Sequence, residues 1–159
     1  MAGKVSNQRD LLVLLLGELL HVERRLAGGV IRDLADAVRN DQLRLALARH
    51  LEETVQHVER IEAAFRRMEV ASTANLSRPF ESAVAQHDEL SANIIETRLA
   101  DEFHAQAAVH TEYWEIAAYE TVLRLTPPEI AELLEPTLDD ERRAASRLLD
   151  HLETGGRDG

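Results

Sequence analysis

The segment from His110 to Tyr119 most constrains what this chain can fold into. It holds the only Trp and both Tyr of the sequence, together with two carboxylates, in a stretch with helical apolar periodicity. Apolar residues occupy most of the circumference of this helix, which is typical of the inner helix of a bundle. Glu112, Glu115 and Tyr119 lie along one line of it. Because buried carboxylates are costly unless they are paired, protonated or bound to a metal, we expect the rest of the chain to supply their partners.

Composition and charge narrow the class of protein. A length of 159 residues suits a single domain, which we place at residues 1–159 with a core at about 7–153. Ala, Leu, Glu and Arg dominate, which favours an all-α fold. The net charge of −11 argues against a nucleic-acid partner, and no basic amphipathic or bilayer-spanning segment suggests a membrane. No cysteine and no signal-peptide pattern occur, so we expect a cytoplasmic protein.

Apolar periodicity and turn signals predict four long helices and one short helix. The long helices are expected over about residues 7–39, 42–68, 94–125 and 127–152, and the short one over about 79–90, in a crossover. Tight turns at residues 40–41 and 126–127 make the first and second pairs of long helices antiparallel hairpins. Gly28-Gly29 predicts a kink or a close helix contact, and Pro136 predicts a kink in the last helix.

An acid lies on or beside the inward stripe of each long helix. Folding about the two turns places Glu23 opposite roughly Val58, and Glu141 opposite Glu112. Such convergence is the pattern of a two-metal carboxylate site, since divalent ions of this class take oxygen ligands. On a helical wheel His50 and His57 lie nearer the core than Glu53. The predicted metal residues, with Glu115 placed behind Glu112 as its support, are Glu23, Glu53, His57, Glu112, Glu115 and Glu141.

The alternative is that these acids are partly exposed and paired with arginines. Candidate partners are Arg24, Arg25, Arg60, Arg142 and Arg143. We expect Tyr113 and Trp114 to lie in the core, and His87, His104 and His151 to be ordinary surface or boundary side chains.

Three motifs make the chain similar to a known family. They are RHLEETVQHVERIE at residues 49–62, YWEIAAY at 113–119 and LEPTLDDE at 134–141. Together with Glu23, they resemble the ferritin-like family typified by the YciE and YciF stress proteins, over residues 10–152. The resemblance implies a ferritin-like four-helix bundle, frequent dimers, a site for one or two Fe or Mn ions, and a link to stress response. The family has no settled reaction, so the question of an enzyme stays open.

Three residues depart from the family pattern. Pro136 stands where a second Glu is usual, Tyr113 follows Glu112 where a His is usual, and Ala144 stands three residues after Glu141 where ferritin-like enzymes place a His ligand. The last helix then offers one carboxylate and no imidazole. We therefore expect weak or single-ion occupancy, or no metal at all.

Two other functions remain open. A hemerythrin-like metal or oxygen binder would group histidines across the bundle, although their spacings are not the paired ones that such a site needs. The candidates are His21, His50, His57, His104 and His110. A metal-free dimeric bundle for protein interaction or stress protection would need none of them.

We also predict a two-fold homodimer, since the second apolar face of the 94–125 helix and the segment Leu11–Leu16 exceed what one core needs.

Overall fold

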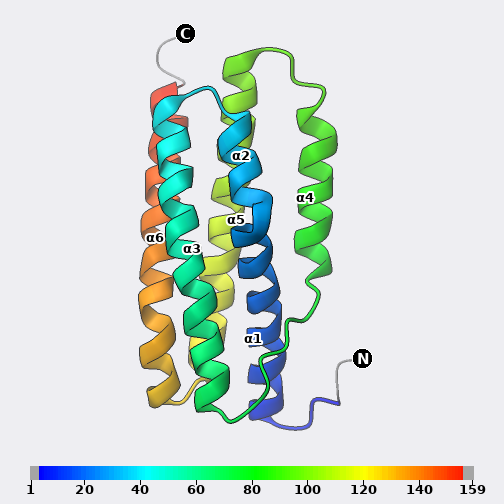
Figure 1. Ribbon diagram of the computed structural model, residues 1–159, viewed down its shortest axis with the longest axis vertical. Helices are drawn as coiled ribbons and strands as arrows, with labels where there is room; N and C mark the ends of the chain where they lie inside the picture. Colours follow the sequence, from blue (N-terminus) through cyan, green and yellow to red (C-terminus); the bar gives the residue numbers. More distant parts are fainter. Residues whose placement is uncertain (1–3, 156–159) are drawn as a thin grey trace.

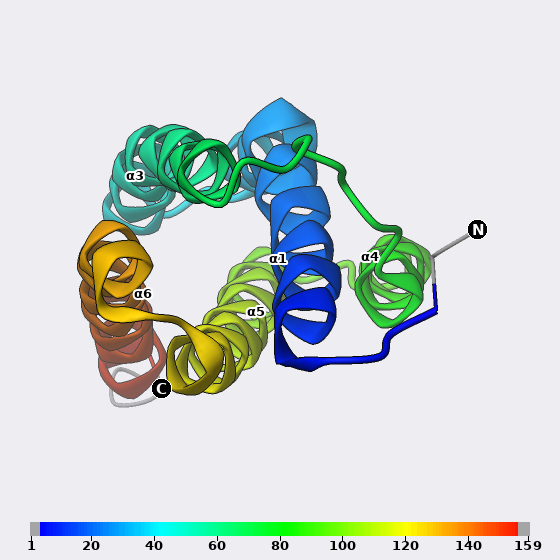
Figure 2. The same ribbon diagram turned by 90° about the horizontal axis from the view of Figure 1, so that it is seen from below.

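The computed structural model describes residues 4–155, and in that range every regular element is a helix. The elements are α1 (Gln8–Arg25), the short π-helical segment η1 (Leu26–Val30), α2 (Ile31–Ala37), α3 (Asp41–Arg67), α4 (Arg78–Ser91), α5 (Thr97–Leu125) and α6 (Pro128–Gly155). The continuous α1–η1–α2 unit, α3, α5 and α6 surround a common core, and α4 stands outside this bundle (Figures 1 and 2). The predicted all-α, ferritin-like bundle is confirmed. The prediction of one domain includes residues 1–3 and 156–159, which lie outside the described range, and stays a prediction.

The two predicted hairpins are present because their turns are well capped. The Asn40 side chain accepts a hydrogen bond from the Leu43 N–H at 2.9 Å, and the Asp101 carboxylate of α5 accepts from the N–H groups of Arg39 and Asn40 at 2.8 Å each. At the other turn the Thr126 hydroxyl donates to the Val122 carbonyl at 2.6 Å. The Asp101 contacts fix the turn between α2 and α3 against α5, and the Thr126 contact closes the end of α5 before α6 begins.

The glycine pair in the first long helix produces the kink that the sequence predicts. Gly29 leaves helical dihedral angles within η1, and a Cβ atom added at Gly28 would meet nothing within 4 Å. A close helix contact is therefore not the reason for this pair. Helix α6 continues through Pro136, whose ring is exposed.

The crossover after α3 runs closely over α1 and positions α4. The Asn75 N–H donates to the Gly17 carbonyl at 2.8 Å, and the Asn75 amide donates to the Leu14 carbonyl at 3.1 Å. A Cβ atom at Gly17 would lie 2.2 Å from Asn75 Nδ2 and 2.7 Å from the Thr73 carbonyl oxygen. This approach therefore requires glycine at position 17.

Two apolar clusters fill the bundle on either side of a polar layer. One includes Leu16, Phe65 and Tyr119, and the other includes Val22, Leu47 and Leu148; Trp114 packs against both. The buried polar side chains between them include Glu23, His50, Thr54, His57, Glu112, Glu115, Thr137, Asp140 and Glu141. The free energy gained by burying the two apolar clusters therefore has to offset the cost of burying the polar layer between them.

The expectation that Tyr113 lies in the core is wrong. Its side chain is 52% exposed, and His110 and Ala117 on the same side of α5 are also exposed. Among the described residues no helix covers this side of α5, since α4 packs further round the bundle (Figure 2). Trp114, the neighbouring residue, is half-buried.

Candidate metal centre

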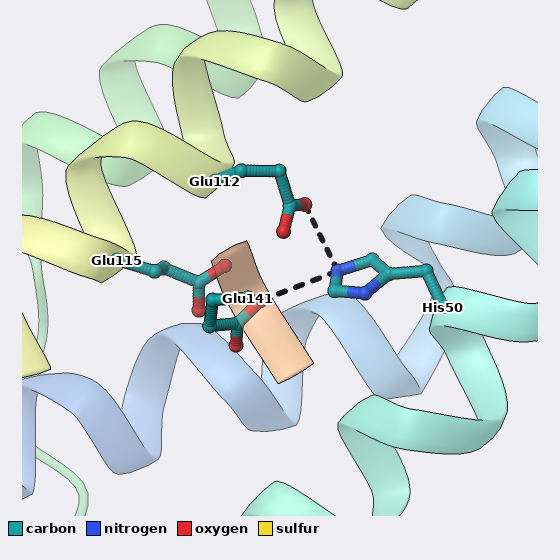
Figure 3. Close-up of side chains that lie close together, drawn as sticks. All are labelled: His50, Glu112, Glu115 and Glu141. Carbon is teal, nitrogen blue, oxygen red and sulfur yellow. Dashed lines mark ion pairs between the residues drawn. The ribbon is translucent and has the colours of Figure 1, made fainter. Parts of the chain in front are cut away.

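Four buried side chains from three helices converge in one half of the polar layer. Ligand atoms of His50 on α3, Glu112 and Glu115 on α5, and Glu141 on α6 all lie within 4.8 Å of one another (Figure 3). His50 Nε2 is 2.9 Å from Glu112 Oε1 and 4.0 Å from Glu141 Oε2. We name this set the His50 group. One imidazole nitrogen and several carboxylate oxygens around one point form a donor set that suits a divalent transition metal.

A second set lies beside the first and shares one of its members. Ligand atoms of Glu23 on α1, His57 on α3 and Glu141 also lie within 4.8 Å of one another. His57 Nδ1 is 2.9 Å from Glu141 Oε1 and 3.3 Å from Glu23 Oε2. We name this set the His57 group. Glu141 therefore turns one oxygen toward each histidine, which is the placement of a carboxylate that bridges two ions.

The helical spacing explains why one helix supplies both imidazoles. His50 and His57 are seven residues apart, which is close to two turns, so both lie on the inward face of α3. Their ring centroids are 6.3 Å apart. Each ring therefore enters a different group while Glu141 reaches both.

Several carboxylate oxygens in these groups are buried without a hydrogen-bond partner. They are Glu112 Oε2, Glu141 Oε2 and both oxygens of Glu115. Glu23 Oε2 and Glu141 Oε1 form no hydrogen bond either, but they lie 3.3 and 2.9 Å from His57 Nδ1. Buried polar atoms are nearly always paired, and each exception costs about 1–3 kcal/mol. A divalent cation is the partner that such oxygens lack, so the residues present fit a metal centre.

Without a metal, protons must balance the charge in this layer. Burial raises the pKa of Glu115 well above its ordinary value, and it raises the pKa of Glu141 to about 7 although His57 opposes the change. Burial alone would lower the pKa of His57, but its contacts with Glu141 and Glu23 outweigh burial and raise that pKa to about 10. The metal-free layer therefore contains imidazolium and neutral carboxyl groups, and metal binding must release protons.

A second layer of side chains holds these residues. The Tyr119 hydroxyl donates to Glu23 Oε1 at 2.5 Å. His57 Nε2 lies 3.3 Å from Asp140 Oδ2, and Arg60 donates to that same oxygen at 2.7 Å. An acid behind a histidine, on the side away from the ligands, is the usual support of a metal-bound imidazole.

Glu53 occupies the corresponding place behind His50. Its Oε2 is 3.8 Å from His50 Nδ1, the ring nitrogen that faces away from Glu112, and it accepts a hydrogen bond from Arg147 at 2.6 Å. Burial acts to raise the pKa of Glu53, but His50 and Arg147 outweigh it and hold that pKa at about 2. Glu53 is therefore an ionised acid outside both groups.

Comparison with known proteins identifies the family. Residues 7–158 match the family described as a domain of unknown function, DUF892. The chain belongs to the DUF892 family. It is 28% identical to protein YciF of Escherichia coli strain K12 over 149 residues. This aligned region covers 89% of this chain and 87% of YciF.

Two solved structures share the fold of this DUF892 protein. The E. coli stress protein YciF superposes with a TM-score of 0.90 at 24% identity, over 98% of this chain and 100% of that one. YcfI from Rhodopseudomonas palustris superposes with a TM-score of 0.89 at 22% identity, over 94% of this chain and 97% of that one. The resemblance to the YciE and YciF family is thereby confirmed. Across residues 4–155, none of the helices has the length and apolar character needed to cross a membrane.

Five of the six residues that the sequence predicts lie in the two groups of this DUF892 protein. They are Glu23, His57, Glu112, Glu115 and Glu141. Glu115 offers an oxygen within 4.8 Å of the ligand atoms of His50, Glu112 and Glu141, and its role as a support of Glu112 stays a prediction. The sixth predicted residue, Glu53, lies behind His50. The predicted set omits His50, although the helical wheel places His50 nearer the core than Glu53.

The arginine alternative describes Glu53, which is partly buried and pairs with Arg49 and Arg147, but it does not describe the acids of the two groups. Arg24 pairs with Glu62, Arg25 with Glu81, and Arg142 with Glu120 and Asp139. Arg60 and Arg143 both contact Asp140, which is behind His57. The arginines therefore surround the polar layer without entering either group.

The histidines do not form the cluster that a hemerythrin-like site would need. His21 contacts Glu81 at 2.9 Å, and the ring nitrogens of His87 and His104 lie 3.0 Å apart. Only His50 and His57, among the described residues, belong to a group that can hold a metal. His104 is also buried, which corrects the expectation of a surface or boundary position.

Proposed function

We propose that this DUF892 protein binds two divalent metal ions in its core, one in the His50 group and one in the His57 group. The observation that carries the proposal is that Glu141 belongs to both groups. Charge supports the same stoichiometry, because the carboxylates of Glu23, Glu112, Glu115 and Glu141, when ionised, balance two divalent ions with neutral imidazoles.

The expectation of a weakened or single-ion site rested on Ala144, since it leaves the last helix without an imidazole. In this fold α3 supplies an imidazole to each group, so that reason no longer applies. We therefore propose full occupancy by a pair.

The donor set favours Fe(II) or Mn(II). Carboxylate oxygens suit manganese, and imidazole nitrogens suit iron. A bound pair of either metal would supply Lewis acidity and one-electron redox chemistry. The protein's own contribution is to fix the ligands, through Tyr119 on Glu23 and Asp140 on His57. Since the relative YciF is described as a stress protein, we propose a stress-related role for this chain as well.

Metal titration tests the proposal. Metal-free protein titrated calorimetrically with Fe(II), Mn(II) and Zn(II) should bind two equivalents of Fe(II) or Mn(II) per chain. Glu141→Ala should remove both, because it belongs to both groups, whereas Glu23→Ala should remove one. Glu120→Ala, an exposed acid on α5, is the matched control and should bind two.

Binding no tighter than about millimolar, which corresponds to about 4 kcal/mol, would contradict the proposal. A metal-free bundle for interaction or stress protection would then be the function to pursue.

We further propose that the chain forms a homodimer. Large apolar side chains remain exposed near the start of α1 and on α5, where Leu11 is 36% and Tyr113 is 52% exposed. A second copy covering these side chains would remove them from water.

A further inference from the structure

A pocket of about 650 Å³ lies between α4, α5 and the η1–α2 segment. Its walls are mainly apolar and include Leu26, Leu34, Phe80, Val84, Phe103 and Trp114. Its lining also includes His50 and Glu112 of the His50 group. Pockets of about 300–1,000 Å³ with apolar walls and a few convergent polar groups are typical of small-molecule sites. This pocket therefore joins apolar space to one half of the candidate metal centre.

Helix α4 leaves space beneath it because contacts fix it at two separate places. Near its start Phe80 is buried, and Glu81 contacts His21 at 2.9 Å and Arg25 at 2.7 Å. Further along, the His87 ring stacks on Phe103 with centroids 5.3 Å apart. Figure 1 shows α4 standing apart from the bundle, and the pocket lining between these two places includes Ala83 and Val84 of α4.

The charges around the pocket favour a neutral ligand. Arg25, its lining cation, is bound to Glu81 and lies on the exposed surface. The acids Asp33 and Asp88 in the lining are also exposed. Among the described lining residues no other Lys or Arg could receive an anionic group. The buried polar side chains in the lining are those of His50, Glu112 and His104, and His104 Nδ1 already contacts His87 Nε2 at 3.0 Å.

We propose that this pocket binds a small neutral molecule with an apolar body and one hydroxyl group, as in an alcohol, and that the hydroxyl points toward the His50 group. The contact with a metal ion rests on the proposed function, whereas binding in the pocket does not. Glu23 and His57 do not appear in the pocket lining, so the ligand would meet one ion of the pair.

Trp114 provides a direct readout, since it is the only Trp of the chain and lines the pocket. Metal-free protein is titrated with 1-butanol, 1-pentanol and 1-hexanol while Trp114 fluorescence is recorded. We expect a saturable change whose dissociation constant falls about fourfold per added methylene, as about 0.8 kcal/mol per buried methylene implies. Hexanoate, with the same carbon chain and a negative charge, should bind at least tenfold more weakly than 1-hexanol.

Filling the pocket should abolish this binding. Ala107→Phe places a ring in the lining from α5, and Ala83→Phe does so from α4. Either variant, provided that it unfolds cooperatively, should weaken 1-hexanol binding at least tenfold. Ala48→Phe, at an exposed position of α3 outside the lining, is the control and should bind as the parent does. A fluorescence change that does not saturate, or an equal loss of 1-hexanol binding in Ala48→Phe, would contradict binding in this pocket.

The orientation is tested with Mn(II)-loaded protein and the proton NMR signals of 1-hexanol. Paramagnetic broadening should be stronger for the signal of the methylene next to the hydroxyl than for that of the terminal methyl. Zn(II) is diamagnetic, so Zn(II)-loaded protein should show no such difference between the two signals. Equal broadening of both signals would overturn the orientation. Failure of Mn(II) to bind would contradict the proposed function and the contact between the ligand and an ion. The fluorescence titration would still show whether the pocket binds an alcohol.

Discussion

Replacing Glu115 with Met should stabilise the metal-free protein and weaken its response to metal. The Glu115 side chain is fully buried, and neither of its oxygens has a hydrogen-bond partner. Burial raises its pKa well above the ordinary value, so it is held as a neutral acid in the metal-free state. In the metal-free state Glu115 therefore lowers the free energy of unfolding, whereas a bound cation would give both of its oxygens a partner.

The size of the effect follows from the cost of an unsatisfied buried polar group, which is about 1–3 kcal/mol. Methionine is unbranched, contains no strong polar group and adapts to irregular space, so Glu115→Met should recover most of that cost. For a chain of this length 1 kcal/mol corresponds to roughly 2–4 °C in Tm. We therefore expect the variant's Tm in chelator to exceed the parent's by about 2–10 °C.

Thermal unfolding followed by circular dichroism, with chelator and then with Mn(II), measures both effects. The parent should gain about 2.7 kcal/mol for each of its two ions when free Mn(II) is one hundred times the dissociation constant of that site. Glu115→Met should lose most of one such increment, because Glu115 belongs to the His50 group alone. Glu120→Met, on the exposed side of the same helix, should change neither quantity appreciably. A variant that is less stable than the parent in chelator, or that keeps the full Mn(II) increment, would refute the reasoning.

Four further outcomes are expected. Asp140→Asn should weaken Mn(II) binding about 10–100-fold in calorimetry, since it removes the acid behind His57. The stability that His57 contributes in chelator should be fully present below its unfolded pKa of about 6.5 and lost as pH rises through its folded pKa of about 10, which thermal unfolding from pH 6 to pH 10 would measure. Gly17→Ala should lower the free energy of unfolding by about 1–3 kcal/mol in urea titration, because its Cβ would clash with the crossover. Light scattering at micromolar concentration should give twice the chain mass of 17.8 kDa, and Leu11→Glu combined with Tyr113→Glu should give the monomer mass.

The helical hairpins were predictable because their determinants are local. Each turn is coded by adjacent residues, such as Asn40 capping α3, and each apolar stripe repeats within a single helix. The position of Tyr113 was not predictable in this way. Periodicity predicts which side chains share a face of a helix, but not which faces pack against another helix. Among the described helices, none packs against the outward side of α5.

The site was predictable where an acid interrupts an apolar stripe, as Glu23 and Glu141 do. On α3 the prediction selected Glu53 and His57 and omitted His50. In the structure His50 faces inward and Glu53, three residues later, stands behind it. The helical wheel places His50 nearer the core than Glu53, so periodicity within α3 already indicated which of the two meets Glu112.

The two halves of the proposed centre are similar in composition and unequal in access. Each has an imidazole from α3 with an acid behind it, and both acids are held by arginines: Glu53 by Arg147, and Asp140 by Arg60. The His57 group adjoins the buried Tyr119 hydroxyl, whereas the His50 group lines the pocket beneath α4. An ion in the His50 group would therefore be the one that a small molecule reaches, while Glu141 would transmit any change in its coordination to the enclosed ion.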